Sequence, residues 1–334
     1  MRIGRKAARF VDTMAKGRDD LVVRTGGTIG GPGKGEGFGP AFTHVAPPSA
    51  PMPVLIAVPH AGRIYPPAVL EQMRDPQLSQ LRLEDRYVDY LAVELAKATG
   101  VGLLVAHAPR AMLDLNRAHD DVDWDMIVGA KRGIRSGSSG SIAANRRARS
   151  GLGLVPRRLP GFGEIWQSQL SRAELDRRIE QIHRPYHDYL AAQLGQIRDE
   201  WGAALLVDLH SMPPLRPQNG EGRSPQIVLG DRFGASCHAG FIARAFQYLD
   251  ERAIETAHNR PYSGGYVLDR HASPLRGLHA IQIEVCRTAY LDKRLAQPTA
   301  GAKQLTALLA GLVRELGAEA AQRGADGELA QAAE

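Results

Sequence analysis

Residues 204–213 read ALLVDLHSMP, and this stretch decides the fold. It begins as a continuous apolar run, which is typical of a strand buried on both faces of a mostly parallel sheet. It ends in His210, Ser211 and Met212 before a proline. In open α/β sheets ligands gather beyond the carboxyl ends of the strands. The stretch therefore predicts a central strand that delivers a histidine to a functional edge.

Four further runs rich in Val, Ile and Leu have the same character, and segments with helical periodicity lie between the runs. The additional strands are expected at VLIAV (54–58), GLLVA (102–106), QIVLG (226–230) and HAIQIEV (279–285). The helices are expected over residues 81–100, 171–200, 235–250 and 301–316. Strands that alternate with helices predict a single α/β domain, with a mostly parallel mixed sheet flanked by helices on both faces.

The ends of the chain differ from this middle part. Residues 1–53 include the glycine-rich stretch 24–40 and are expected to form a flexible basic extension. This stretch is not a phosphate loop, because Thr28 and Gly35 occupy positions that the Walker motif reserves for other residues. We expect a catalytic domain over 54–320 and a C-terminal tail over 321–334.

One segment interrupts the alternation of strands and helices. Residues 131–163 are rich in glycine and arginine, and segments of such length in compact domains are often functional lids or disordered insertions. Both interpretations stay open, a lid over an anionic substrate and a solvated insertion.

Composition excludes several classes of protein. The 334 residues carry a net charge of +6, but residues 1–20 contribute +3 and residues 131–160 contribute +8. The basic charge is therefore local, and neither patch interleaves aromatic residues, so nucleic acid is not an expected partner. No apolar run reaches the ~20 residues that cross a bilayer, so no membrane association is expected. With only Cys237 and Cys286, and no export signal, we expect a cytoplasmic protein with reduced cysteines.

Chemistry-bearing side chains stand at the ends of the predicted strands. His60 follows the strand 54–58, His210 ends the central strand, and Glu284 lies on the strand 279–285. Two imidazoles and a carboxylate predict a catalytic metal site of the zinc type, with one ion. The third ligand should be an acid, and the candidates are Glu84, Asp85 and Asp89. Asp208 is a candidate acceptor for an imidazole N–H.

A histidine pair and a cysteine are weaker candidates for a metal site and for a nucleophile. His183 and His187 have the i, i+4 spacing of helical zinc ligands, but Arg184 replaces the expected glutamate and Pro185 disturbs the turn, so packing or support of other residues is the favoured role. Cys286 lacks an adjacent histidine that would activate it as a nucleophile, and it is expected to pack as a small apolar residue.

A series of longer motifs shows a family resemblance. They follow one another in the order found in the N-formylglutamate amidohydrolase family and span about residues 54–295: VPHAGRIYP (58–66), LEDRYVDYL (83–91), RAMLDLNR (110–117), RSGLGLVPR (149–157), RPYHDYL (184–190), DLHSMPP (208–214), VLGDRFGASC (228–237), NRPYSGGYV (259–267) and IQIEVCRTAYL (281–291). The resemblance implies a fold similar to that of the zinc carboxypeptidases and aspartoacylases.

The resemblance also implies roles for single residues. His60 and His210 match the family's first and last metal ligands, and Glu284 matches its catalytic glutamate. The zinc carboxypeptidases and aspartoacylases have a glutamate three residues after the first histidine ligand, where this chain has Arg63. We therefore take Asp85, in the LEDRYVD motif, as the third ligand.

Substrate contacts are expected from arginines and one glycine loop. Asn116 and Arg117 match the family's carboxylate clamp, and arginine recognises a carboxylate through a bidentate fork. A second carboxylate, or the formyl oxygen, is left for Arg110 (which we count as catalytic), Arg63 or Arg287, although strand alternation would turn Arg287 to the opposite face. Tyr262, Gly264 and Gly265 are expected to form a tight loop at the site.

The expected function is hydrolysis of N-formyl-L-glutamate to formate and glutamate, which the resemblance connects with histidine degradation. The partner is then a small acidic N-acyl amino acid. Two alternatives stay open at this point: the same metal site could hydrolyse another N-acyl amino acid or a peptide-like amide, or the chain could be a catalytically silent protein that binds dicarboxylates.

Overall fold

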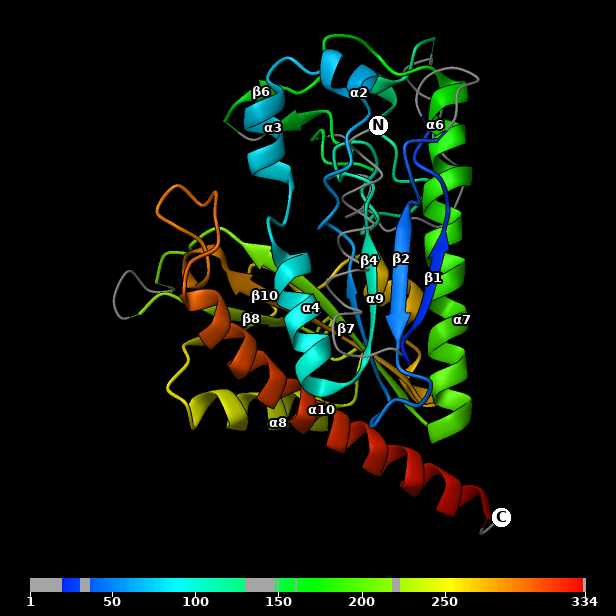
Figure 1. Cartoon of the computed structure of the whole chain (residues 1–334), viewed down its shortest axis with the longest axis vertical. Helices are drawn as coiled ribbons and strands as arrows, with labels where there is room; N and C mark the ends of the chain where they lie inside the picture. Colours follow the sequence, from blue (N-terminus) through cyan, green and yellow to red (C-terminus); the bar gives the residue numbers. More distant parts are fainter. Residues whose placement is uncertain are drawn as a thin grey trace.

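The computed structural model describes residues 20–30, 37–129, 148, 150–159, 161–217 and 223–332. Eight strands form one mixed sheet in the order β1-β2-β4-β3-β7-β10-β8-β9 (Figure 1). The strands are β1 (Val22–Gly26), β2 (Phe42–Ala46), β3 (Val54–Val58), β4 (Gly102–Ala106), β7 (Ala204–Met212), β8 (Ile227–Gly230), β9 (Thr256–His258) and β10 (Leu278–Cys286), and a separate short hairpin pairs β5 (Arg158–Leu159) with β6 (Gly163–Glu164).

Helices connect these strands. They are α2 (Pro67–Glu71), α3 (Pro76–Leu83), α4 (Val88–Thr99), α6 (Arg172–Arg178), α7 (Arg184–Trp201), α8 (Ala239–Asp250), α9 (Tyr266–His271) and α10 (Gly301–Ala332), with a π-helical turn η2 (Ile179–His183) between α6 and α7 and 3-10 turns η1 (Trp124–Met126), η3 (Pro274–Arg276) and η4 (Arg287–Ala289). Among the described residues, no helix combines the length and apolarity that crossing a membrane requires.

The central strand β7 lies between β3 and β10 and is parallel to both. All nine of its residues are buried, as its continuous apolar sequence predicts. Four of the seven strand pairings in the sheet are parallel and three are antiparallel. The predicted α/β class with a mixed sheet is therefore confirmed.

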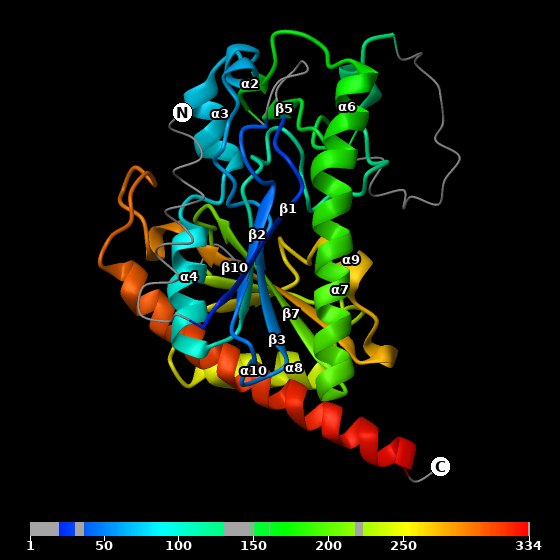
Figure 2. The same cartoon turned by 45° about the vertical axis from the view of Figure 1, so that its right-hand side comes forward.

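Helices cover both faces of the sheet. Alternate residues of β7 point to opposite sides, so Leu206 packs in the core under α7, and Val207 packs in the core under α4, α8 and α10. Figure 2 shows α7 in front of the strands on the right and α4 on the left, while α10 runs from the left below the sheet to the lower right. This two-sided covering explains why the central strands are apolar on both faces.

The expected flexible extension over residues 1–53 is wrong for two segments. Strand β2 pairs with β4 inside the sheet, and β1 pairs with β2 at its edge. Phe42 is 2% exposed and packs edge-to-face on Tyr186 of α7, with ring centroids 5.9 Å apart. The β-branched and aromatic residues of these two short runs favour strands although glycines surround them. Residues 1–19 and 31–36 lie outside the described residues.

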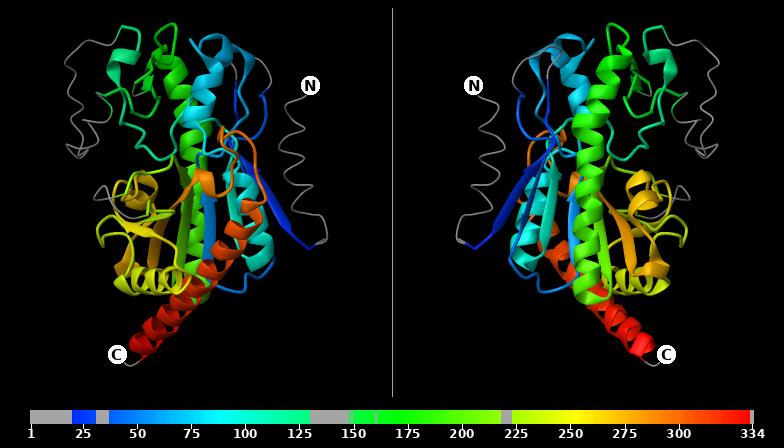
Figure 3. Two further views of the ribbon diagram at one scale, coloured as in Figure 1. Left: turned by 90° about the vertical axis from the view of Figure 1, so that its left-hand side faces the viewer. Right: turned by 90° about the vertical axis from the view of Figure 1, so that its right-hand side faces the viewer.

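The expected C-terminal tail over 321–334 is also wrong for most of its length. Helix α10 continues to Ala332, and Figure 3 shows its last turns extending beyond the sheet. The sequence of this part is rich in alanine, which has the highest intrinsic helix propensity. Ala320 on this helix is fully buried, so α10 packs against the core past the predicted boundary of the helix at residue 316.

The predicted lid over 131–163 lies largely outside the described residues. Its described part contains a turn, 150–157, and the strands β5 and β6. Together with α2 and α3 this part forms a layer beyond the end of the sheet at which β3, β7 and β10 finish (Figure 1).

Candidate metal and substrate site

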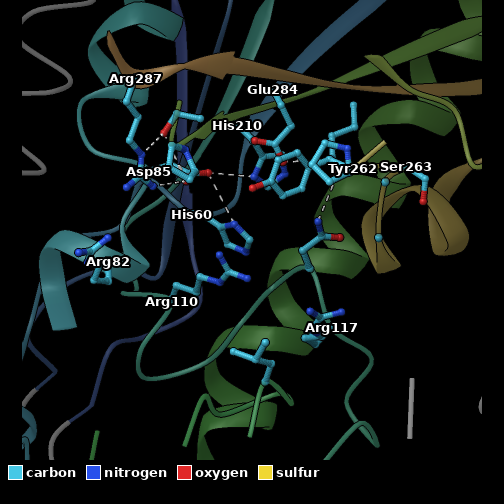
Figure 4. A pocket seen from close by; sticks show the side chains of 18 residues that line it. His60, Arg82, Asp85, Arg110, Arg117, His210, Tyr262, Ser263, Glu284 and Arg287 are labelled. Carbon is cyan, nitrogen blue, oxygen red and sulfur yellow. Dashed lines mark hydrogen bonds and ion pairs between the residues drawn. The ribbon is translucent and has the colours of Figure 1, made fainter. Parts of the chain in front are cut away.

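A cavity of about 460 Å³ opens at the carboxyl ends of β3, β7 and β10. These strand ends supply His60, His210 and Glu284, as expected from the sequence, and Figure 4 shows all three directed into one space. Two loops close the cavity from the side. One is residues 110–117, and the other is residues 261–265.

Three buried side chains form a candidate metal site. His60, Asp85 and His210 each offer one ligand atom, and these atoms lie within 4.8 Å of one another. The side chains are only 2–3% exposed. Two imidazoles and one carboxylate are a donor set that catalytic zinc sites use, with a further position left for water. Among the described residues this is the one group of three or more metal-ligating side chains that meets such a spacing.

Both imidazoles are oriented by a second carboxylate. His60 Nε2 lies 2.6 Å from Asp114 Oδ1, and His210 Nε2 lies 3.0 Å from Asp208 Oδ2. A carboxylate accepts only, so each Nε2 carries the proton and each Nδ1 is directed toward Asp85 Oδ2, at 3.7 Å and 2.9 Å. Carboxylates that hold the outer nitrogen of a histidine are typical partners of metal ligands. The residues present therefore fit a divalent cation.

The electrostatics of the pocket favour a cation. Burial lowers the pKa of His210, but Asp208 and Asp85 together hold that pKa well above its usual value. Burial raises the pKa of Asp85, yet the hydrogen bonds of His210 and His60 keep it well below its usual range. The same concentration of buried carboxylates that stabilises an imidazolium stabilises a bound metal ion.

A break between two helices places Asp85 in this site. The sequence predicts one helix over residues 81–100, with Asp85 and Asp89 on one face; this prediction is wrong. Helix α3 ends at Leu83, and α4 begins only after Tyr87, whose φ of 59° is left-handed. The backbone N–H of Asp85 donates to the carbonyl of His60 at 3.0 Å, which joins the break to the end of β3.

Arg287 supports Asp85 from the side away from the histidines. Its Nη2 lies 3.2 Å from Asp85 Oδ1 (Figure 4). The Ser211 hydroxyl donates to the same oxygen at 3.4 Å. Strand alternation placed Arg287 on the opposite face, and this prediction fails because β10 ends at Cys286 and a 3-10 turn follows. The end of the strand, and not the alternation of its side chains, was the feature of the sequence that could have placed Arg287 correctly.

Arg63 does not contribute to the cavity. Its Nη2 donates to Asp89 Oδ2 at 2.6 Å, and its guanidinium lies 4.8 Å from the centre of the Tyr87 ring. It is not among the described residues that line the cavity. Asp89, a candidate third ligand, is thus engaged with Arg63. The pairing with Asp89 outside the cavity speaks against the predicted substrate contact of Arg63, which stays a prediction.

Glu284 faces His210 across the two central strands. The two residues are partners in the parallel register of β10 and β7, and Glu284 is 7% exposed. Burial raises the pKa of its carboxyl to about 7, with Asp85 and Asp208 adding to the effect and His210 opposing it. Gln282 donates to Glu284 Oε1 at 3.0 Å. A carboxyl group with a pKa near neutrality can both accept and return a proton.

The predicted carboxylate clamp lies on the loop after β4. Asn116 Oδ1 accepts the backbone N–H of Val267 at 2.9 Å, and Asn116 and Arg117 both line the cavity. The neighbouring loop approaches so closely that a Cβ on Gly265 would lie 2.5 Å from Asn116 Oδ1. A side chain at position 265 would therefore displace the Asn116 amide, and the expected contact between this loop and the site is present.

Arg110 and Asp114 complete this side of the cavity. Arg110 Nε donates to Asp114 Oδ2 at 2.9 Å, so its guanidinium is fixed at the cavity wall. Burial raises the pKa of Asp114, but Arg110 and His60 hold that pKa well below its usual value. Tyr262 also lines the cavity, as predicted.

Some lining residues were not identified from the sequence. Arg82, in the last turn of α3, lines the cavity and lies 4.6 Å above the Phe162 ring. Leu152 lines it from the turn 150–157, within the glycine- and arginine-rich segment. The motif RSGLGLVPR (149–157) contains Leu152, but nothing in the sequence assigned either residue to the cavity, since both reach it through the packing of the layer beyond the sheet.

A family model described as N-formylglutamate amidohydrolase matches residues 52–291. An N-formylglutamate deformylase of Pseudomonas putida is 31% identical over 258 residues, which cover 74% of this chain and 88% of that protein. A second one, of Pseudomonas aeruginosa, is 28% identical over 269 residues and covers 79% of this chain and 91% of that protein.

Solved structures give the same picture. The crystal structure of N-formylglutamate amidohydrolase from Ralstonia eutropha JMP134 is similar with a TM-score of 0.70 and 26% identity, covering 87% of this chain and 99% of that one. The gene product Atu2144 from Agrobacterium tumefaciens shares the fold, with a TM-score of 0.56 and 18% identity, covering 81% and 91% of the two chains.

Proposed function

This chain belongs to the N-formylglutamate amidohydrolase family, and from this premise we propose that it hydrolyses N-formyl-L-glutamate to formate and L-glutamate. The observation that carries the proposal is the meeting of three groups in one cavity. These groups are the histidine–aspartate cluster, a buried glutamate and an arginine–asparagine pair suited to a carboxylate. Hydrolysis of the amide of an acidic N-acyl amino acid needs all three.

Zinc, one ion, is the proposed cofactor, and His60, Asp85 and His210 would hold it. When bound there, it supplies a Lewis acid that polarises the formyl carbonyl and lowers the pKa of water. The donor set and the carboxylates behind both imidazoles support this assignment.

Glu284 is the proposed general base and acid. It takes a proton from the attacking water and passes it to the leaving amine of glutamate, and a pKa near 7 suits both steps. Gln282 keeps one carboxyl oxygen in place by donating to it.

The arginines hold the substrate and stabilise charge. Arg117 and Asn116 bind one carboxylate of the glutamate part, through a guanidinium fork and an amide. Arg110 stabilises the second carboxylate or the charge that develops on the formyl oxygen, since its Nε is fixed on Asp114 and its remaining N–H groups lie at the cavity wall. Tyr262 and the backbone at Gly265 close the other side.

We place this activity in the cytoplasm and in the degradation of histidine, where formate and glutamate are the products released. The test is a formate-release assay on N-formyl-L-glutamate together with metal analysis of the purified protein. N-acetyl-L-aspartate serves as the competing substrate. Faster turnover of the acetyl compound would overturn the assignment of the acyl group, and the absence of turnover for both compounds with zinc present would overturn the proposed activity.

A further inference from the structure

The clamp residues sit on a short loop whose carbonyl groups are held from behind. His187 Nε2 lies 3.0 Å from the carbonyl oxygen of Leu115, and His183 Nε2 lies 2.9 Å from that of Arg117. Both histidines are 1–2% exposed and lie outside the cavity lining. The two bonds flank Asn116 on either side, so the backbone that carries both clamp residues is fixed to one helix.

Hydrogen bonding determines which ring nitrogens carry protons. A carbonyl oxygen only accepts, so both Nε2 atoms donate. His187 Nδ1 then has a lone pair and accepts from His271 Nε2 at 2.9 Å, with the two rings stacked at an angle of 16°. Burial lowers the pKa of His183 to about 4 and of His271 to about 3, so these rings are neutral near pH 7. His271 thus donates to His187, which donates to the loop, and His183 donates to the loop directly.

A π-helical turn brings the two histidines to the loop. The turn spans Ile179–His183, between α6 and α7, and π-turns inside helices occur frequently at functional sites. One additional residue in a helix rotates everything after it by roughly 100°. Without this turn, the helix face that carries His183, at the end of the turn, and His187, on α7, would be rotated relative to the loop that begins at Asp114.

We infer that His183 and His187 are positioning residues for substrate binding, which set the place of the Arg117 and Asn116 side chains through the loop backbone. The identity of the substrate in this inference rests on the proposed function. The inference itself concerns only the hydrogen bonds from His183 and His187 to the loop carbonyls. In the described contacts neither histidine touches the candidate metal ligands.

Two substitutions at one position separate this role from general packing. In His183→Gln the amide nitrogen reaches about as far as Nε2 and can still donate to the Arg117 carbonyl. In His183→Asn the amide nitrogen is too far from the Arg117 carbonyl to donate, although the side chain is still a polar amide. We expect His183→Asn to raise KM for N-formyl-L-glutamate about tenfold with kcat within twofold of the wild type, and His183→Gln to stay within threefold on both.

His279→Asn is the matched control. His279 is 5% exposed, lies on β10 at the end far from the cavity, and its Nδ1 has no hydrogen-bond partner. The same substitution there should leave KM unchanged. Equal changes in His183→Asn and His183→Gln, or no change in either, would overturn the inference.

Binding of L-glutamate, measured by titration calorimetry, provides a readout that does not depend on turnover. The His183→Asn variant should bind glutamate about tenfold more weakly while its metal content stays at the wild-type level. If the wild type releases no formate, the proposed function fails, but the calorimetric comparison still tests whether the hydrogen bond of His183 to the loop supports binding of glutamate. If the wild type is active and glutamate affinity is the same in all variants, the inference fails alone.

Discussion

Asp114 Oδ1 accepts from His60 Nε2 at 2.6 Å, and the same oxygen accepts the backbone N–H of Asn116 at 2.9 Å. One buried carboxylate thus orients a candidate metal ligand and the first residue of the substrate clamp. Its other oxygen accepts from Arg110. The candidate metal site and the proposed carboxylate clamp are therefore linked through one side chain, and a change at Asp114 should affect both.

Replacing Asp114 by asparagine tests this link. Asparagine keeps the size but removes the charge that holds the His60 proton and the Arg110 guanidinium. We expect zinc affinity to fall about 10–100-fold, as for other carboxylates behind a metal-binding histidine, and KM to rise in the same variant. Competition with a chelator measures the first effect and initial rates at saturating zinc measure the second. A variant with wild-type zinc affinity would separate Asp114 from the metal site.

Glu284→Gln tests the proposed proton transfer. The amide is the same size as the carboxyl group but cannot accept a proton from water, and general acid–base groups contribute about 10²–10⁴-fold to rates. We expect kcat to fall by at least 100-fold while zinc content and glutamate affinity stay at wild-type levels. Activity within tenfold of the wild type would remove Glu284 from the mechanism.

Much of this arrangement could be predicted from the sequence. The continuous apolar runs predicted the central strands, and the polar residues at their ends predicted the cavity that contains His60, His210 and Glu284. Such predictions succeed because a buried parallel strand has a simple sequence pattern and its carboxyl end has one place in the fold. Asp208, which accepts the hydrogen bond of His210 Nε2, was identified from its position on the same strand.

Predictions failed where a break in regular structure decides the position of a side chain. The left-handed Tyr87 separates Asp85 from Asp89, and the 3-10 turn after Cys286 returns Arg287 to the metal site. Helical and strand periodicities assume that an element continues, so they misplace residues next to its end. Strand β2 was missed for a different reason, since its pairing with β4 depends on tertiary contacts that surrounding glycines conceal.

Two arginines with different surroundings allow a direct comparison. Arg117 lines the cavity, whereas Arg63 bonds Asp89 outside it. A lysine cannot reproduce the bidentate fork of arginine on a carboxylate, and hydrogen bonds to charged groups contribute about 1.5–3 kcal/mol. We expect Arg117→Lys to raise KM about 10–100-fold and Arg63→Lys to change KM less than threefold, both measured by formate release.

The reverse order of these two effects would restore Arg63 as a substrate contact. Arg63→Lys keeps a cation near Asp89, so its fold should stay intact, and a thermal unfolding scan provides that control. An unchanged KM in Arg117→Lys would contradict the assignment of the clamp.

Arg287→Met tests whether Asp85 depends on its support. The buried guanidinium donates to the carbonyl of Glu84 at 2.7 Å, to Ser211 at 3.1 Å and to Asp85. Its removal takes the charged donor from the buried Asp85 carboxylate and a donor from the Glu84 carbonyl, and breaking a buried ion pair costs about 3–5 kcal/mol. We expect a lower midpoint of urea unfolding and reduced zinc content at equal protein concentration. Wild-type zinc content in a folded Arg287→Met variant would contradict this role.

Buried neutral histidines make the stability of the chain depend on acid. Burial lowers the pKa values of five imidazoles to about 3–4, from an unfolded value near 6.5: those of His44, His107, His183, His271 and His279. Between these values the unfolded chain binds more protons than the folded chain, so stability is complete above pH 6.5 and falls as the pH drops toward 4. Each such imidazole then costs about 1–2 kcal/mol at pH 5.

Urea unfolding followed by circular dichroism between pH 5 and pH 8 measures this dependence. The free energy of unfolding should decline steeply below pH 6.5, because the five rings outweigh the opposing effect of Glu284, and it should fall gently above pH 7, because the raised pKa of His210 acts in the opposite sense there. His279→Leu cannot take up a proton at that position in either state, so its curve should be less steep than that of the wild type by one proton. Because His279 lies far from the cavity, this control leaves the site intact, and a wild-type curve that stays level down to pH 5 would show that these rings are not buried in the neutral form.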